Sequence, residues 1–229
     1  QKANHNFIKD VGDVQKLKSV KMAPIDLLWG GSPCQGFSCR GKRAGMADPR
    51  SALFWEFVKQ IKGKKPKFFL LENNASMKKE DQAVITEALG VSPVRINSKL
   101  STGALRDRLY WANFPITQPK DMGVKLIDVI DQEVPQDAFW NQEGIEKLMS
   151  YVDRRGRSRW NMGDHHDVKR DKAKAITRNI SKGAPKNLLV DQKGRYRKIT
   201  LPEVARLMGF PDGYLSDVEG VSNTAKYQG

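Results

Sequence analysis

The chain has 229 residues, 39% of them hydrophobic, and its 40 lysines and arginines against 26 acidic residues give a net charge of +14. No apolar run approaches the roughly 20 residues that a membrane-spanning helix needs, and the first residues do not follow a signal-peptide pattern. Two cysteines exclude a disulfide framework, and together with three scattered histidines they match no zinc signature. The excess of positive charge favours an anionic partner, with nucleic acid as the leading candidate.

The positive charge is concentrated in two blocks of the sequence. Residues 1–115 carry 20 basic and 10 acidic side chains, and residues 140–198 carry 16 basic and 7 acidic ones. Residues 116–139 and 199–229 are acidic on balance. The two blocks could line two walls of a cleft for an anionic ligand, or they could be ordinary solvated surfaces.

The segment from Pro24 to Ser38 places a cysteine shortly after a predicted buried strand. The apolar residues of Ile25–Trp29 suffice for that strand, and the two glycines that follow allow close backbone approaches. Cys34 would then lie just past the carboxyl end of the strand, where open α/β sheets bind their ligands. A lone cysteine is more often a small buried hydrophobic side chain than a nucleophile, so both interpretations stay open at this point.

Further along the chain, helices and strands are predicted in alternation. Apolar residues at helical spacing predict an amphipathic helix over Ser51–Ile61, with Ser51 as its N-cap. An apolar strand, Phe68–Leu71, leads directly into Glu72. The alternation continues with a helix at residues 80–89 and extended segments at 94–97 and 109–113, which indicates a mostly parallel sheet.

Two arginines, Arg106 and Arg108, precede the last of these extended segments. Their alternate spacing would place both guanidinium groups on one face of an extended chain. A cysteine, a carboxylic acid and a pair of arginines are therefore expected to converge near strand ends.

At about residue 116 the regular alternation gives way to a polar, basic region that extends to residue 196. Within it, DRRGRSRW at 153–160 interleaves arginines with glycine and tryptophan, a composition that suits phosphate and base-edge contacts. His165 and His166 lie beside Asp167, but adjacent side chains point in different directions, so no metal site is expected there.

The last predicted helix begins after Thr200, in the segment ITLPEVARLMGFPDGY. Thr200 has the residue type of an N-cap, Pro202 falls in the first turn, and Glu203 stands at the third helical position. This combination predicts a capped helix start.

Four of these segments, PCQGFS, the EN after a strand, RDRLYW and ITLPEVARLMGFPDGY, resemble the ordered motifs of the DNA cytosine-5 methyltransferases. PCQ is the form usual in the bacterial and phage enzymes, and RDRLYWANFP is also similar to the animal de novo branch. The resemblance implies an α/β fold, a Rossmann-like S-adenosylmethionine-dependent methyltransferase sheet with a small, irregular target-recognition domain. It places the catalytic domain at 1–115, the target-recognition region at 116–196, and a helix returning toward the catalytic domain at 197–229.

The resemblance also implies a role for individual residues. Cys34 would add to carbon 6 of a flipped cytosine, Glu72 would hold a proton at ring nitrogen 3, and Arg106 and Arg108 would hold the carbonyl at position 2 and Glu72 itself. The positions that match cofactor contacts are Asp13, Val14, Pro33 and Leu53, and Asn74 replaces the valine usual after EN. DNA contacts are expected from Gln35, Ser38, Arg40, Arg155, Arg157, Arg159, Thr177 and Arg178.

The family's first motif, FxGxG, and its last, GNA or GNS, have no counterpart in the chain. We therefore expect this sequence to be part of a longer polypeptide, the alternative being a catalytically silent DNA-binding relative. A third possibility, the tRNA-methylating branch, is disfavoured because its CFT signature is absent. The expected partners are double-stranded DNA and S-adenosylmethionine, with no metal and no membrane. We expect a monomer on DNA, in the cytoplasm of a bacterial or phage-infected cell, or in the nucleus of a eukaryote.

Overall fold

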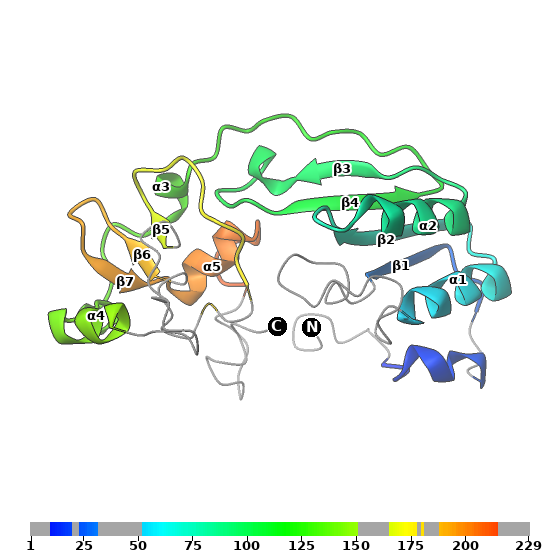
Figure 1. The fold of residues 1–229 in the computed structure, drawn as a ribbon, viewed down its shortest axis with the longest axis horizontal. Coiled ribbons are helices and arrows are strands. Elements are labelled where there is room, and N and C mark those ends of the chain that lie inside the picture. Colours follow the sequence, from blue (N-terminus) through cyan, green and yellow to red (C-terminus); the bar gives the residue numbers. More distant parts are fainter. Residues whose placement is uncertain are drawn as a thin grey trace. The chain divides into compact units, whose positions relative to one another are not determined.

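The computed structural model describes residues 10–19, 23–31, 52–150, 165–177, 180 and 188–214, and it divides into two compact units. The four-stranded unit comprises Ile8–Asn97 and Asp107–Pro119. The three-stranded unit comprises Gln1–Phe7, Ser98–Arg106 and Lys120–Gly229. Figure 1 labels the helices and strands of both. None of the helices in the described ranges is long and apolar enough to cross a membrane.

The four-stranded unit is built on one sheet with strand order β1-β2-β4-β3. β1 pairs with β2 in parallel, whereas β4 pairs antiparallel with both β2 and β3. Strands β1, β2 and β3 therefore run in the same direction, as the prediction of a mostly parallel sheet requires, and β4, between β2 and β3, is the reversed strand of this sheet. The connection Ser98–Arg106 between β3 and β4 is too short for the crossover of a dozen or more residues that parallel strands need. The strands are β1 (Leu27–Gly31), β2 (Phe68–Asn74), β3 (Val94–Asn97) and β4 (Asp107–Ala112).

Helices α1 (Ala52–Lys64) and α2 (Lys79–Leu89) confirm the two predicted helices, and Ser51 lies outside the described residues. Both helices bury apolar side chains against the sheet. At Gly30 the contact is close enough that an added Cβ would lie 2.8 Å from the ring of Phe57. A short 3₁₀ helix, η1 (Val14–Ser19), contacts α1. The buried cluster consists of Phe54, Phe57, Val58, Phe69, Leu71, Met77, Ile85, Leu109 and Trp111.

The three-stranded unit contains a second, smaller sheet in the order β5-β6-β7, with β5 and β6 parallel and β6 and β7 antiparallel. Its core joins α3 and α5 to this sheet through residues such as Leu126, Leu189 and Leu207. The strands are β5 (His166–Asp167), β6 (Leu188–Val190) and β7 (Tyr196–Lys198). The helices are η4 (Ser98–Leu100), α3 (Leu126–Val129), η5 (Gln136–Ala138), α4 (Gln142–Met149) and α5 (Leu201–Leu207).

The start of α5 confirms the predicted cap. The backbone N–H of Glu203 donates to Thr200 Oγ1 at 3.4 Å, and the N–H of Thr200 donates to Glu203 Oε2 at 2.7 Å. This reciprocal arrangement is a capping box, and Pro202 occupies the first turn. Glu203 is completely buried, so this carboxylate also needs partners from the rest of the unit.

Candidate active site

Gly31, the last residue of β1, is the partner of Glu72 in the parallel register, and Glu72 lies two residues before the carboxyl end of β2. Burial alternates along β2, with Phe69, Leu71 and Asn73 buried, so period two places Glu72 on the opposite face from the helix-covered core. The side chain of Glu72 is 26% exposed. A carboxylate at the end of a strand is thus accessible to a ligand.

Arg108 holds this carboxylate from the neighbouring strand β4. Its Nε lies 2.6 Å from Glu72 Oε1, and its Nη1 donates to the carbonyl of Asp107 at 2.8 Å. The arginine side chain is 14% exposed, so the pair is partly buried and still accessible to solvent. The predicted association of Glu72 with Arg108 is present.

Gly31 makes room for the acid. A Cβ added at Gly31 would lie 3.2 Å from Glu72 Oε2, tighter than ordinary van der Waals contact. The glycine at the end of β1 therefore allows the carboxylate to lie against the backbone of the strand that leads toward Cys34.

Cys34 itself lies outside the described residues, as do Pro33, Gln35, Ser38 and Arg40. The chain nevertheless limits how far the thiol can be from Glu72. Cys34 is the third residue after Gly31, so their Cα atoms are at most about 11 Å apart. The nucleophile predicted from the sequence is therefore tethered within reach of this strand end.

Arg106 is placed differently from Arg108. It precedes β4 and groups with the three-stranded unit, whereas Asp107 and Arg108 group with the four-stranded unit. The carbonyl of Arg106 accepts a hydrogen bond from the N–H of Ser98 at 3.0 Å. Arg106 is thus held by the connection between β3 and β4, whereas Arg108 lies within β4.

Three predicted cofactor residues lie in the four-stranded unit. Asp13 is exposed, and its Oδ1 accepts from the N–H of Gln15 at 2.9 Å, at the start of η1. Val14 is half-buried in η1. Leu53 is half-buried in the first turn of α1, the helix that η1 contacts.

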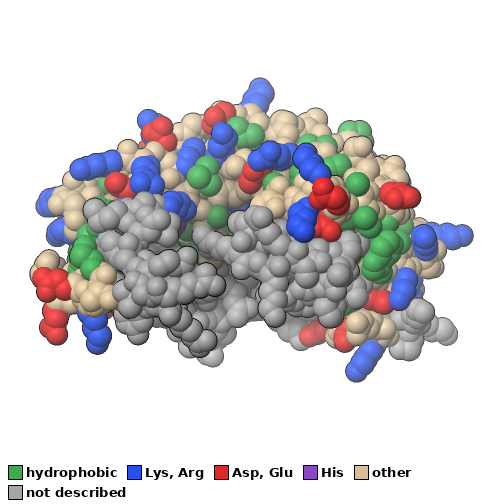
Figure 2. Space-filling model, in the orientation of Figure 1, with side chains coloured by type: hydrophobic (Ala, Val, Ile, Leu, Met, Phe, Trp, Pro, Cys, Tyr) green, Lys and Arg blue, Asp and Glu red, His purple; other side chains and the backbone are tan. Residues whose placement is uncertain are grey.

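Of the predicted DNA-contacting residues in the polar region, Thr177 is described. It is half-buried in the three-stranded unit, and its carbonyl accepts from the N–H of Ile180 at 2.9 Å. On the described part of the face drawn in Figure 2, lysines and arginines stand among acidic side chains. Outside the described residues lie Arg155, Arg157, Arg159 and Arg178.

Comparison with known proteins identifies the family. The family model of C-5 cytosine-specific DNA methylases matches residues 2–91 and 98–229. The chain belongs to this family. The predicted family is thereby confirmed.

Several curated relatives are bacterial and phage methyltransferases of this family. Type II methyltransferase M1.ScrFI of Lactococcus lactis subsp. cremoris is 27% identical over 95% of this chain and 61% of its own length. Orphan methyltransferase M.SPRI of Bacillus phage SPR is 39% identical over 47% of this chain and 27% of its own length. Type II methyltransferase M.HpaII of Haemophilus parainfluenzae is 29% identical over 92% of this chain and 70% of its own length. The chain therefore spans less than two thirds of the first two relatives.

Solved structures of methyltransferases share the fold. The Dnmt2 methyltransferase of S. pombe superimposes with a TM-score of 0.70 at 18% identity, over 99% of this chain and 80% of that one. The Entamoeba histolytica methyltransferase EhMeth gives a TM-score of 0.69 at 13% identity, over 99% and 79%. The predicted fold class, a Rossmann-like α/β methyltransferase sheet, is confirmed.

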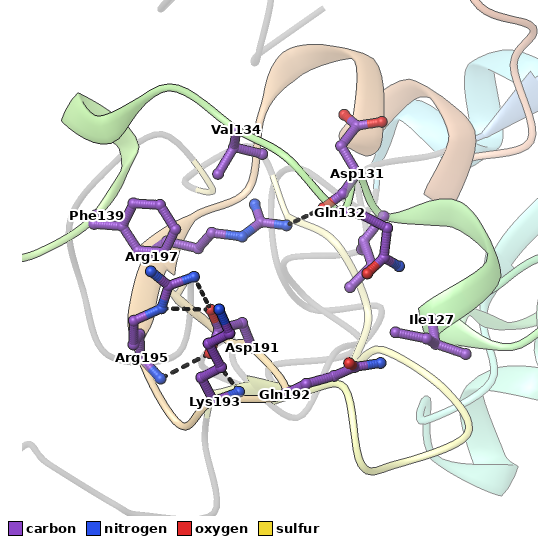
Figure 3. A pocket seen from close by; sticks show the side chains of 11 residues that line it. Ile127, Asp131, Gln132, Val134, Phe139, Asp191, Gln192, Lys193, Arg195 and Arg197 are labelled. Carbon is purple, nitrogen blue, oxygen red and sulfur yellow. Dashed lines mark hydrogen bonds and ion pairs between the residues drawn. The ribbon is translucent and has the colours of Figure 1, made fainter.

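This family member also has a pocket of about 200 Å³ in its three-stranded unit, shown in Figure 3. The guanidinium of Arg195 lies 4.2 Å from the ring centroid of Phe139, and its Nη2 lies 2.8 Å from Asp191 Oδ2. Burial favours the neutral form of Asp191, but hydrogen bonds from Arg195 outweigh it and hold the pKa below its ordinary value. None of the residues predicted from the sequence lines this pocket. Arg195, just before β7, and Arg197, on β7, are two residues apart, and this alternate spacing of arginines is the feature of the sequence that could have pointed to the pocket.

The two adjacent histidines of this methylase-family chain are buried in the three-stranded unit. His165 and His166 are 7% and 2% exposed, and neither Nδ1 has a hydrogen-bond partner among the described residues. Burial, with help from the charges of Lys174 and His165, lowers the pKa of His166 to about 4. The described residues contain no group of three or more histidine, cysteine, aspartate or glutamate side chains that could hold a metal ion.

Proposed function

We propose that the protein transfers a methyl group from S-adenosylmethionine to carbon 5 of cytosine in double-stranded DNA, with Cys34 as the nucleophile. The observation that carries the proposal is the Glu72–Arg108 pair at the carboxyl end of β2. It lies in register with Gly31, at the end of the strand that leads to Cys34. An acid, a guanidinium and a tethered thiol are the groups that this reaction needs.

Cys34 would activate the cytosine ring by covalent addition. Carbon 5 is a poor nucleophile, and bond formation between the sulfur and carbon 6 moves electron density onto carbon 5. The thiolate is the reactive form, and a free thiol has a pKa of roughly 8.5. We propose that the positive charge of Arg108 helps to supply the thiolate. Once carbon 5 has received the methyl group, a base or water would remove the proton from carbon 5, and the thiolate would leave as the double bond reforms.

Glu72 would act on ring nitrogen 3. A proton held there by the carboxyl group keeps negative charge from accumulating on the ring while the sulfur adds. Arg108 orients the carboxyl through its Nε, and its own guanidinium is anchored to the carbonyl of Asp107. We assign to Arg106 and Arg108 the binding of the carbonyl at position 2, with Arg108 also holding Glu72.

The described residues fit the adenine part of S-adenosylmethionine, which when bound supplies the methyl group. Asp13 is exposed, and no described residue donates to its Oδ2, so this oxygen can accept from an exocyclic amine. Val14 and Leu53 offer half-buried apolar surface on η1 and α1, which contact each other. We propose that these residues hold the cofactor together with Pro33.

The target base must leave the duplex to reach these groups, at a cost of a few kcal/mol. We propose that Gln35, Ser38 and Arg40 contact the flipped nucleotide or the adjacent phosphates. The rest of the DNA contacts would come from Arg155, Arg157, Arg159, Thr177 and Arg178. In this assignment residues 1–115 are catalytic, 116–196 recognise the target, and 197–229 return to the catalytic part. Affinity for DNA should fall steeply with salt, because each neutralised phosphate releases counterions.

The proposal is tested by trapping with duplex DNA that contains 5-fluorocytosine, using the full-length protein and S-adenosylmethionine. The fluorine cannot be removed as the proton is, so the covalent adduct persists and is seen on a denaturing gel. We expect an adduct with the wild-type protein and with Cys39→Ala, and none with Cys34→Ala. An adduct that survives Cys34→Ala contradicts the proposed nucleophile. DNA binding without any adduct supports a catalytically silent relative, and methyl transfer to tRNA instead of DNA contradicts the proposed substrate.

A further inference from the structure

The connection Ser98–Arg106 leads into the strand that carries Arg108. It groups with the three-stranded unit, and it passes into β4 between Arg106 and Asp107. Contacts that restrain this connection therefore also restrain the backbone of Arg106.

Lys172 binds the connection through three backbone carbonyls. Its Nζ donates to the carbonyl of Lys99 at 2.7 Å, to that of Thr102 at 3.2 Å, and to that of Val124. An ammonium group has three donors, so all of them are used. The lysine thus joins the 98–106 connection to a second, sequence-distant segment.

The residue after Lys172 adds a two-sided backbone contact. The N–H of Leu105 donates to the carbonyl of Ala173 at 2.8 Å, and the N–H of Ala173 donates to the carbonyl of Gly103 at 2.7 Å. Gly103 is in close contact with its surroundings, because an added Cβ would lie 2.8 Å from Val129 Cγ2 and 3.2 Å from the carbonyl of Lys125. The connection therefore has little room to shift while Lys172 and Ala173 stay in place.

Hydrogen bonds within the connection transmit this restraint to Arg106. Ser98 Oγ donates to the carbonyl of Ala104 at 2.7 Å, and the N–H of Ser98 donates to the carbonyl of Arg106 at 3.0 Å. A displacement at Lys99 or Thr102 would consequently move the backbone of Arg106.

We propose that Lys172 is a positioning residue for the methyl-transfer reaction, which holds the Ser98–Arg106 connection so that Arg106 is presented to the target base. The inference rests on the proposed function. Lys172 acts through the backbone carbonyls that it binds, so its removal should slow the covalent step more than it weakens DNA binding.

The test compares Lys172→Met with Lys169→Met, which removes the same charge from an exposed lysine three residues away. With full-length protein and 5-fluorocytosine DNA, we expect Lys172→Met to slow adduct formation at saturating DNA by roughly 10- to 100-fold, as for a misplaced reacting group. DNA affinity should change less than about threefold. Lys172→Arg, which keeps a cation, should recover part of the rate.

A double-mutant cycle with Arg106→Ala separates positioning from general destabilisation. If Lys172 acts through Arg106, Lys172→Met should cost little additional rate in the Arg106→Ala background, because coupled residues are not additive. The proposal is overturned if the rate losses of Lys172→Met and Arg106→Ala multiply in the double variant. It is also overturned if Lys172→Met forms the adduct at a rate within about twofold of Lys169→Met. Thermal unfolding of each variant identifies any that do not fold, and Lys172→Arg then serves in place of Lys172→Met.

Hydrogen exchange makes the outcome independent of catalysis. The amides of Leu105 and Ala173 should exchange faster in Lys172→Met than in wild type or in Lys169→Met. Unchanged protection overturns the proposal even if adducts form. If Lys172→Met loses protection at these amides while the wild-type protein forms no adduct, Lys172 holds the connection but the proposed function fails. That result overturns the link between Lys172 and the reaction.

Discussion

Each of the two units contains an arginine–glutamate pair at the same N–O distance of 2.6 Å, but the two pairs differ in their surroundings. In the three-stranded unit, Arg197 and Glu203 are 2% and 0% exposed. In the four-stranded unit, Arg108 and Glu72 are 14% and 26% exposed. The Arg197–Glu203 pair is therefore enclosed in the interior of its unit, whereas the Arg108–Glu72 pair is partly exposed.

The bonding of the two carboxylates shows what this difference means. Glu203 accepts two bonds from Arg197 and one each from the N–H groups of Thr200 and Asp131. Burial favours its neutral form, but these donors outweigh burial and hold the pKa of Glu203 below its ordinary value. Glu72 has Arg108 as its charged partner among the described residues. The enclosed pair supports the fold, whereas the partly exposed Glu72 is accessible to a substrate.

Glu72→Gln tests the open pair and should have the largest effect on activity. The amide keeps the shape of the side chain but cannot hold the acidic proton, so we expect methyl transfer to fall by roughly 10²- to 10⁴-fold. The free energy of unfolding should change by less than about 1 kcal/mol, because the pair is partly exposed. Steady-state methyl transfer and urea unfolding of the same preparation measure the two effects. A stable variant with full activity would remove Glu72 from the mechanism.

Glu203→Gln tests the enclosed pair and should act on stability. Removing one charge leaves Arg197 buried without compensation, which costs about 3–5 kcal/mol of unfolding free energy. Urea unfolding at neutral pH measures this loss. The exposed Glu143→Gln in the same unit is the control and should lie within about 0.5 kcal/mol of wild type. A Glu203→Gln variant as stable as Glu143→Gln would show that the enclosed pair is dispensable.

His166 is a buried titratable side chain, and its effect on stability can be compared with that of the enclosed Arg197–Glu203 pair. Its pKa is lowered to about 4 in the folded state from an ordinary value of 6.5, so the unfolded chain binds the proton more readily. The contribution of neutral His166 to the free energy of unfolding is present above pH 6.5 and is lost as the pH falls toward 4. Between pH 7 and pH 5 we expect a loss of about 2 kcal/mol, measured by urea unfolding at each pH. His166→Gln should flatten this dependence, and an equal slope in wild type and variant would exclude His166 as its source.

Thr200→Ala should give the smallest effect, because it removes one hydrogen bond of the capping box and leaves the Arg197–Glu203 pair intact. We expect a loss of about 1 kcal/mol in the free energy of unfolding. Thr200→Ser keeps the hydroxyl and should stay close to wild type. A loss of several kcal/mol would mean that the cap orients Glu203 toward Arg197, and the two features would then have to be treated as one.

The sequence by itself determined the elements whose signal is local. Apolar residues at helical spacing predicted α1 and α2, and Thr200 with Glu203 predicted the start of α5. The apolar run Phe68–Leu71 predicted β2, which continues through Glu72 to Asn74. The order of motifs also predicted the family. The predictions of helices, caps and strands succeed because these features depend on residues close to one another in the chain.

Only the tertiary structure decided the antiparallel pairing of β4, the position of Arg106 just before β4, and the enclosed Arg197–Glu203 pair. Strand order depends on non-local pairing, which the residues of one strand do not encode. The three carbonyls that bind Lys172 belong to residues whose identity is irrelevant to the contact, because every residue has the same backbone acceptor. Contacts of this kind leave no pattern in the sequence and become visible only when the chain is folded.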